Sequence, residues 1–160
     1  MNQIRPRRSV LYIPGSNARA IEKAKVLGAD ALIFDLEDAV APEMKALARD
    51  QVCSAVKSRT FGKKELIIRI NAEDTVWSAD DLEAALCAAP DAILLPKVAS
   101  ADTLLRVDDR LQKSGSADHI RLWAMIETPK AILNIQSIAA AARGGLGRLE
   151  CFVIGTNDLA

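Results

Sequence analysis

Two apolar segments in the second half of the sequence each lead to a carboxylate. Residues Leu122 to Ile126 are followed at once by Glu127, and residues Cys151 to Ile154 lead in the same way to Asp158. Two carboxylates from neighbouring strands, together with water and substrate oxygens, make a site suited to Mg²⁺, because this ion prefers oxygen and takes few ligands from the protein. The pattern therefore indicates a metal-binding edge at the ends of strands.

Earlier apolar segments also end in charged or amide side chains. An arginine beside the metal could hold a substrate carboxylate or a developing enolate, because its planar fork donates two parallel hydrogen bonds. Mg²⁺ and arginine together would stabilise negative charge on a carbonyl oxygen while a carbon–carbon bond breaks. These side chains are, in chain order, Glu37, Asp38, Arg69, Asn71 and Lys97.

Each of these side chains also has an ordinary structural interpretation. A single acid at the end of a strand is more often a solvated loop residue or a helix cap. Arg69 could be a structural partner of Glu37, and Lys97 could belong to a buried ion pair. The functional interpretation depends on the convergence of several such groups on one rim.

Apolar runs and turn signals define the elements that position these residues. Thr128 is a good N-cap and Pro129 suits the first helical position, so a helix should begin there. Ser78 and Asp81 have the spacing of a capping box for another helix. The predicted strands are Ser9–Ile13, Ala31–Leu36, Leu66–Ile70, Ala92–Leu95, Leu122–Ile126 and Leu149–Ile154, and the predicted helices cover 18–27, 42–55, 78–87, 101–113 and 130–143.

Six predicted strands alternate with five helices, and no Asn-Gly or similar hairpin signal joins neighbouring strands. This alternation predicts βαβ units with right-handed crossovers, and the continuous apolar strands indicate a parallel sheet covered on both faces. A Rossmann sheet is the competing architecture, but no G-x-G-x-x-G follows the first strand. The predicted fold class is therefore α/β, with a TIM (β/α)8-type barrel.

Chain length bears on how much of that barrel is present. A complete barrel usually takes about 250 residues, whereas this sequence has 160 and ends just after the sixth predicted strand. We therefore expect a single partial TIM-barrel domain over residues 1–160. About six of the eight βα units would be present, and strands seven and eight would be missing.

Composition argues against several other classes of protein. The 21 basic and 21 acidic residues cancel, which gives no electrostatic case for nucleic acid, and no apolar run is long enough for a membrane span or a signal peptide. The three cysteines lack C-x-x-C spacing and indicate buried thiols in a reducing compartment, so the cytoplasm is the expected location. The single histidine, His119, precedes a strand, which argues against a catalytic triad or a histidine metal site.

Six short motifs follow one another along the chain. They are Arg8–Gly15, Asp35–Pro42 with Lys45 and Arg49, Ile68–Asn71, Leu95–Lys97, Ile126–Pro129 and Gly155–Asp158. Together they resemble the HpcH/HpaI aldolase and citrate lyase superfamily, in particular its citrate lyase β-subunits and malyl-CoA lyases. Each motif alone is weak evidence, but six motifs in this order are specific to the superfamily. The resemblance spans essentially the whole chain.

The resemblance implies a Mg²⁺-dependent TIM-barrel lyase that acts on a 3-hydroxyacyl thioester such as citryl-CoA or malyl-CoA. A retro-Claisen cleavage would release an acetyl-type thioester and a keto acid. HpaI-type aldolases of the superfamily use a histidine base near the second strand, where this sequence has Glu37 and Asp38, and this difference favours the thioester branch. The resemblance also implies a homo-oligomer, a trimer or hexamer.

The resemblance assigns roles to individual residues by motif position. Glu127 and Asp158 would be the metal ligands. Arg69 would bind the carboxylate or keto-acid oxygen of the substrate. Glu37 lies where the family has an active-site acid, which would orient Arg69 or a metal-bound water.

Further substrate contacts are implied in the same way. Lys23, on the first helix, matches a position that contacts the CoA phosphates. Tyr12 and Asn157 would line the same pocket, and Glu127 would face the substrate as well as the metal.

Two alternatives of a different kind remain open. One is a 2-keto acid aldolase or a phosphoenolpyruvate or pyruvate enzyme on a related barrel. The other is a catalytically inactive half-barrel that serves as an assembly subunit, which the missing strands would explain.

Overall fold

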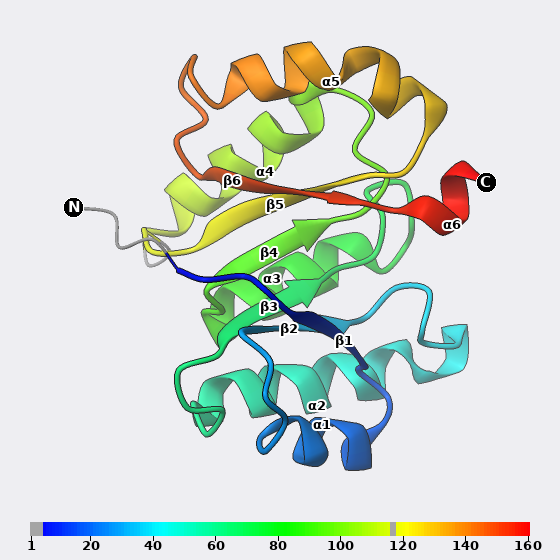
Figure 1. The fold of residues 1–160 in the computed structure, drawn as a ribbon, viewed down its shortest axis with the longest axis vertical. Helices are drawn as coiled ribbons and strands as arrows, with labels where there is room; N and C mark the ends of the chain where they lie inside the picture. The colour runs from blue at the N-terminus through cyan, green and yellow to red at the C-terminus, as the bar shows by residue number, and fades with distance from the viewer. Residues whose placement is uncertain (1–4, 116–117) are drawn as a thin grey trace.

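Six parallel strands lie side by side in the order in which they occur along the chain (Figure 1). We describe them from a computed structural model that covers residues 5–115 and 118–160. The strands are β1 (Val10–Pro14), β2 (Ala31–Asp35), β3 (Glu65–Arg69), β4 (Ala92–Leu95), β5 (Arg121–Ile126) and β6 (Leu149–Ile154). The helices are α1 (Ala18–Ala24), α2 (Lys45–Ser58), α3 (Ser78–Ala88), α4 (Ala101–Ser114), α5 (Pro129–Ala141) and α6 (Thr156–Leu159), and the 3₁₀ turn η1 (Pro42–Met44) precedes α2.

Helices α1 to α5 pack against one face of this sheet (Figure 1). Their buried side chains, such as Ile21 and Val52, share a core with strand residues such as Phe34. The buried residues of the smaller core on the other face are all strand residues, among them Ile33 and Trp123. A doubly wound sheet has helices on both faces and reverses its strand order, whereas a (β/α)8 barrel does neither. The predicted TIM-barrel-type fold is therefore confirmed, and in residues 5–115 and 118–160 the sheet is open, with β1 and β6 at its edges.

The inner face of the sheet becomes polar at the carboxyl ends of β2 and β3. Side chains alternate along a strand, so Asp35 follows Ile33 on the inner face and Arg69 follows Ile67. The parallel register pairs Asp35 directly with Arg69. These two charges therefore meet at the end of the sheet where barrel enzymes carry their chemistry.

Helix starts provide one confirmed and one wrong prediction. The Thr128 side chain accepts a 3.1 Å hydrogen bond from an amide in the first turn of α5, and Pro129 is the first residue of that helix. The capping box of Ser78 and Asp81 is wrong, because Trp77 precedes α3 and no side chain caps it. The Asp81 carboxylate instead accepts hydrogen bonds from the loop that follows β3. The short helix α6 was not predicted.

The cysteines differ in exposure. Cys87 is exposed on α3, whereas Cys53 and Cys151 are partly buried, and all three thiols are free. The expectation of buried thiols is therefore wrong for Cys87. None of the helices in the part of the chain that the structure describes is both long and apolar enough to cross a membrane.

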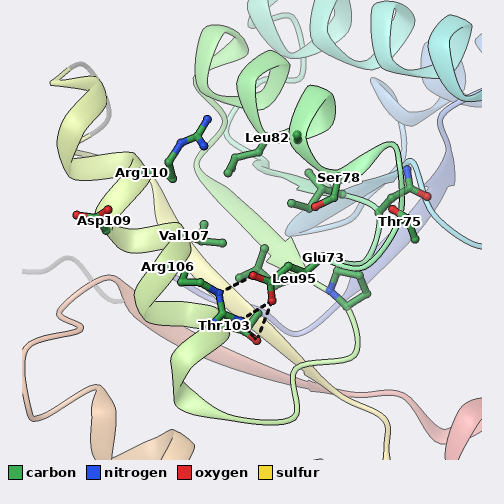
Figure 2. A pocket seen from close by; sticks show the side chains of 14 residues that line it. Glu73, Thr75, Ser78, Leu82, Leu95, Thr103, Arg106, Val107, Asp109 and Arg110 are labelled. Carbon is green, nitrogen blue, oxygen red and sulfur yellow. Dashed lines mark hydrogen bonds and ion pairs between the residues drawn. The ribbon is translucent and has the colours of Figure 1, made fainter.

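A cavity of about 410 Å³ lies between α3 and α4 (Figure 2). Leu82 and Val107 contribute apolar walls, and Glu73 and Arg106 lie on its rim. Arg106 donates hydrogen bonds of 2.6 and 2.7 Å to the two oxygens of Glu73. These rim charges are therefore satisfied within the protein, and the chemically richer cluster lies at the strand ends.

Candidate active site

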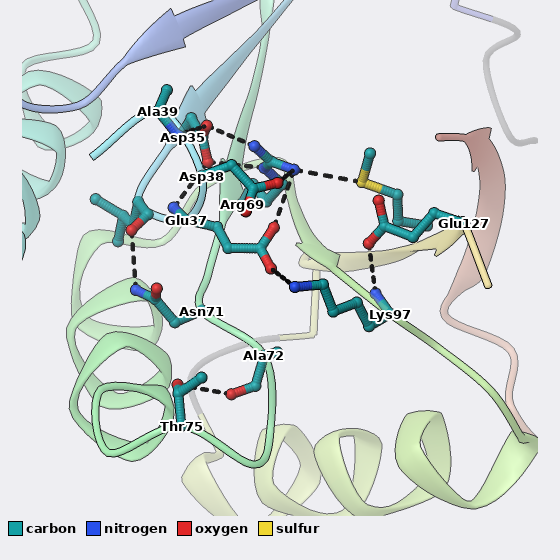
Figure 3. A network of polar contacts seen from close by, with 12 residues as sticks. Asp35, Glu37, Asp38, Ala39, Arg69, Asn71, Ala72, Thr75, Lys97 and Glu127 are labelled. Atoms are coloured by element: carbon teal, nitrogen blue, oxygen red, sulfur yellow. Dashed lines mark hydrogen bonds and ion pairs between the residues drawn. The ribbon is translucent and has the colours of Figure 1, made fainter. Parts of the chain in front are cut away.

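Arg69 is the centre of the polar cluster at the ends of β2 and β3 (Figure 3). Its Nε and Nη2 donate hydrogen bonds of 2.7 and 2.6 Å to the two oxygens of Asp35, and both side chains are buried. Burial by itself lowers the pKa of a guanidinium group, but the hydrogen bonds and charge of Asp35 outweigh it and raise the pKa of Arg69. Arg69 is therefore a permanent, fixed positive charge.

Glu37 lies against a different nitrogen of the same guanidinium group. Its Oε2 is 2.9 Å from Arg69 Nη1, and its Oε1 is 3.4 Å from Lys97 Nζ. Both distances are those of ion pairs, yet neither oxygen receives a well-aligned hydrogen bond from the residues described. Burial raises the pKa of Glu37 to about 7, and the neighbouring Arg69 and Lys97 only partly oppose this shift. Asp38, which is exposed, reaches Arg69 Nη1 at 3.3 Å.

The pKa of Glu37 predicts a pH-dependent stability. The value rises from 4.5 in the unfolded chain to about 7 in the folded protein, so the contribution of Glu37 is fully present below pH 4.5 and is lost as pH rises through about 7. Relative to Glu37→Gln, the wild-type protein should lose up to about 3 kcal/mol of unfolding free energy between pH 5 and pH 8. Urea unfolding at the two pH values measures this difference. The exposed Glu43→Gln should show no such difference, and a pH-independent gap for Glu37→Gln would contradict the raised pKa.

Glu127 is confined by main chain on two sides. Its Oε1 accepts a 2.7 Å hydrogen bond from the backbone N–H of Lys97. Lys97 has a φ of 51°, a left-handed conformation that is uncommon outside glycine, and it directs the N–H at Glu127 while its side chain reaches Glu37. On the other side, a Cβ at Gly155 would lie 2.5 Å from Glu127 Cβ and 2.6 Å from Oε2. Glu127 thus occupies the space that a side chain at position 155 would need.

A cavity of about 500 Å³ opens beside these groups. The Tyr12 ring lies 5.3 Å from the Arg69 guanidinium carbon, and the Met125 sulfur lies 3.6 Å from Arg69 Nη1. The cavity is therefore part aromatic and apolar, and part charged. Its lining includes five of the residues predicted for the site, Tyr12, Arg69, Glu127, Asn157 and Asp158.

The oxygen donors at this cavity fit Mg²⁺. Glu127 lies just after β5, and Asp158 lies in α6 next to the Asn157 amide. Burial raises the pKa of Glu127, the hydrogen bond from the Lys97 N–H partly opposes this shift, and the charge of Asp158 adds to it. In residues 5–115 and 118–160, no group of three or more His, Cys, Asp or Glu side chains could hold a metal alone. Two carboxylates completed by water and substrate oxygens are the kind of donor set that Mg²⁺ takes.

Comparison with known proteins identifies the family. A model of the HpcH/HpaI aldolase/citrate lyase family matches residues 8–160. The chain belongs to this family. The predicted resemblance is therefore confirmed over nearly the whole chain.

Two curated relatives are similar to this chain. A (3S)-malyl-CoA thioesterase of Cereibacter sphaeroides is 46% identical over 159 residues, which cover 99% of this chain and 52% of the relative. A citrate lyase subunit beta of Escherichia coli is 36% identical, over 96% of this chain and 51% of the relative. The chain thus spans about half the length of the curated relatives it matches.

A solved structure has a similar fold. Protein CitE of Mycobacterium tuberculosis, in complex with magnesium, acetoacetate and coenzyme A, aligns with a TM-score of 0.72 at 28% identity. The alignment covers 93% of this chain and 48% of that protein. The likeness supports the barrel-type arrangement of the six strands.

The structure brings most of the predicted site residues together. Lys23 is the exception, and Asp35 joins the cluster without having been predicted. Lys23 is exposed on α1 and does not line the cavity with the others. Asp35, the main partner of Arg69, lies in the second motif but was not among the predicted site residues. A charged residue at the end of the apolar strand Ala31–Asp35, two residues after Ile33, was a signal that could have identified it.

Proposed function

We propose that the protein is a Mg²⁺-dependent carbon–carbon lyase that cleaves a 3-hydroxyacyl thioester of the citryl-CoA or malyl-CoA type. Its products would be an acetyl-type thioester and a keto acid. The observation that carries this proposal is that one cavity is lined by the buried guanidinium group of Arg69 and by the carboxylates of Glu127 and Asp158. The names of the citrate lyase relative and of the magnesium, acetoacetate and coenzyme A complex support it.

The residues of this chain are suited to hold the negative charge that such a cleavage moves. Held by Glu127 and Asp158, Mg²⁺ would supply Lewis-acid stabilisation of a substrate oxygen. Cleavage passes the proton of the 3-hydroxyl group to a base, turns its carbon into a keto carbon and leaves the electrons of the broken carbon–carbon bond as an enolate of the thioester. Uptake of a proton by this enolate gives the acetyl-type thioester. Arg69 would bind the carboxylate or keto-acid oxygen, because its charge is permanent and it lines the cavity.

The other predicted residues take supporting roles in this proposal. Glu37 would orient Arg69, because it contacts the guanidinium group from outside the set of residues that line the cavity. Tyr12 and Asn157 would bound the substrate pocket. Lys23 would contact the CoA phosphates, and assembly into a homo-oligomer belongs to the same proposal.

Glu127→Gln tests the metal assignment. The substitution keeps the shape of the side chain but removes the charge that would bind Mg²⁺, so kcat/KM for malyl-CoA or citryl-CoA cleavage should fall by at least about 100-fold. Calorimetric titration should show Mg²⁺ binding lost in parallel. Glu73→Gln, at the rim of the cavity between α3 and α4, is the matched control and should leave both unchanged. Unchanged cleavage by Glu127→Gln would exclude Glu127 as a ligand.

Thioester hydrolysis is a second candidate function, favoured by the (3S)-malyl-CoA thioesterase that is 46% identical to this chain. Hydrolysis of malyl-CoA releases a free thiol and malate. Cleavage of its carbon–carbon bond instead gives a keto acid and an acetyl thioester, without free thiol. Parallel assays for thiol and for keto acid on one sample separate the two reactions.

The two remaining alternatives predict different results in the same assays. A 2-keto acid aldolase would act on a keto acid and be indifferent to CoA. An inactive assembly subunit would bind ligand without turnover, and full activity of the 160-residue chain would exclude that role.

A further inference from the structure

A buried lysine holds the main chain beside Glu37. Lys45, the first residue of α2, is only 6% exposed. Its Nζ lies 2.7 Å from each of three acceptors, the carbonyl oxygens of Leu36 and Glu37 and the Oδ1 of Asn71. Its Nζ also lies 5.2 Å from the centre of the Trp77 ring. All three donors of the ammonium group are thus used, which is what a buried charge requires.

The acceptor Asn71 extends this contact into a network across two strand ends. Its Nδ2 donates hydrogen bonds to the Leu36 carbonyl oxygen at 2.9 Å and to Asp81 Oδ2 at 2.6 Å (the first is drawn in Figure 3). Asp81, from α3, also accepts a 2.7 Å hydrogen bond from Arg49 Nε on α2. The network therefore ties the loop after β2 to the loop after β3. A satisfied buried network of this kind specifies geometry, because any member left unpaired would be costly.

The first of these loops carries Glu37, and the second begins directly after Arg69. Glu37 depends on its main chain for position, since neither of its carboxylate oxygens receives a well-aligned hydrogen bond from the described residues. That main chain is held on one side by Asp35 Oδ1, which accepts a 2.8 Å hydrogen bond from the Glu37 N–H. On the other side it is held by Lys45, at the Glu37 carbonyl oxygen.

We propose that Lys45 is a positioning residue that fixes the Leu36–Glu37 backbone to Asn71, and thereby keeps the Glu37 carboxylate against the Arg69 guanidinium group in the active site. The inference rests on the proposed lyase function. It assigns a role to Lys45, which lies in the second motif but is outside the predicted site. A purely structural lysine would instead contribute to stability alone.

Lys45→Met tests the proposal, because it keeps most of the apolar side chain and removes all three donors. In the folded variant, kcat should fall by about 10- to 100-fold, while KM and Mg²⁺ affinity change little, since Glu127 is held by Lys97 and not by Lys45. Lys57→Met, at an exposed position on the same helix, is the matched control and should leave kcat unchanged. A folded Lys45→Met protein with kcat within about two-fold of wild type would overturn the proposal.

Two further arms keep the test decisive. If Lys45→Met does not fold, Asn71→Ser removes one acceptor and keeps the buried charge. A lower kcat in that variant supports the proposal, and an unchanged kcat overturns it.

If the wild-type protein proves to have no lyase activity, the proposed function fails independently. A double-mutant cycle of Lys45→Met and Glu37→Gln in urea unfolding then decides the role of Lys45, because non-additive losses of unfolding free energy support its coupling to Glu37, and additive losses overturn it.

Discussion

Arg69→Lys should lower kcat/KM for thioester cleavage by about 100- to 1,000-fold although the charge is retained. A lysine ammonium group cannot reproduce the pair of hydrogen bonds, 2.7 and 2.6 Å long, that Arg69 donates to Asp35, nor reach Glu37 at the same time. One buried carboxylate would be left incompletely paired, so the unfolding free energy should also fall by about 3 kcal/mol. Steady-state kinetics and urea unfolding measure the two effects.

Arg106→Lys provides the matched control. Arg106 forms the same two-bond contact with Glu73, but both partners are exposed. Exposed ion pairs contribute about 1 kcal/mol or less, so this variant should keep its activity and nearly all of its stability. If Arg69→Lys retained half of the wild-type kcat/KM, the guanidinium geometry would not matter for the reaction.

Gly155→Ala should weaken metal binding through a single methyl group. That group would lie 2.5 Å from Glu127 Cβ and 2.6 Å from Glu127 Oε2, so either the carboxylate or the end of β6 must move. Overpacking of this kind costs about 1 to 3 kcal/mol of stability. Because Mg²⁺ tolerates little departure from octahedral geometry, its affinity should fall by at least about 10-fold, which calorimetric titration detects.

Gly147→Ala separates this effect from the general effect of replacing glycine. Gly147 lies in the loop before β6, and an added Cβ there meets nothing within 4 Å. The variant should bind Mg²⁺ as the wild type does. Equal affinities of wild type and Gly155→Ala would show that Glu127 does not need its present position to hold the metal.

Much of the fold could be predicted because its signals are local. The strands Ala92–Leu95 and Leu149–Ile154 were predicted with their observed bounds, since each is a short apolar run between turn residues. The Thr128–Pro129 start of α5 was also predicted, because its cap is formed within one turn of the chain. The predicted capping box at Ser78 does not form, because the Asp81 carboxylate accepts hydrogen bonds from Asn71 and Arg49, which are distant in sequence.

Hydrophobic periodicity and turn chemistry act over a few residues, so the strand–helix alternation and the set of polar residues at the strand ends could be predicted from the sequence. Which of these residues pair depends on the three-dimensional fold. Asp35 meets Arg69 because the register of β2 and β3 places them opposite each other. Lys45 holds the loop that carries Glu37, because the packing of α2 buries its ammonium group among acceptors that follow β2 and β3. Such contacts join residues 34 and 26 positions apart, and their geometry depends on strand register and helix packing, which no local pattern encodes.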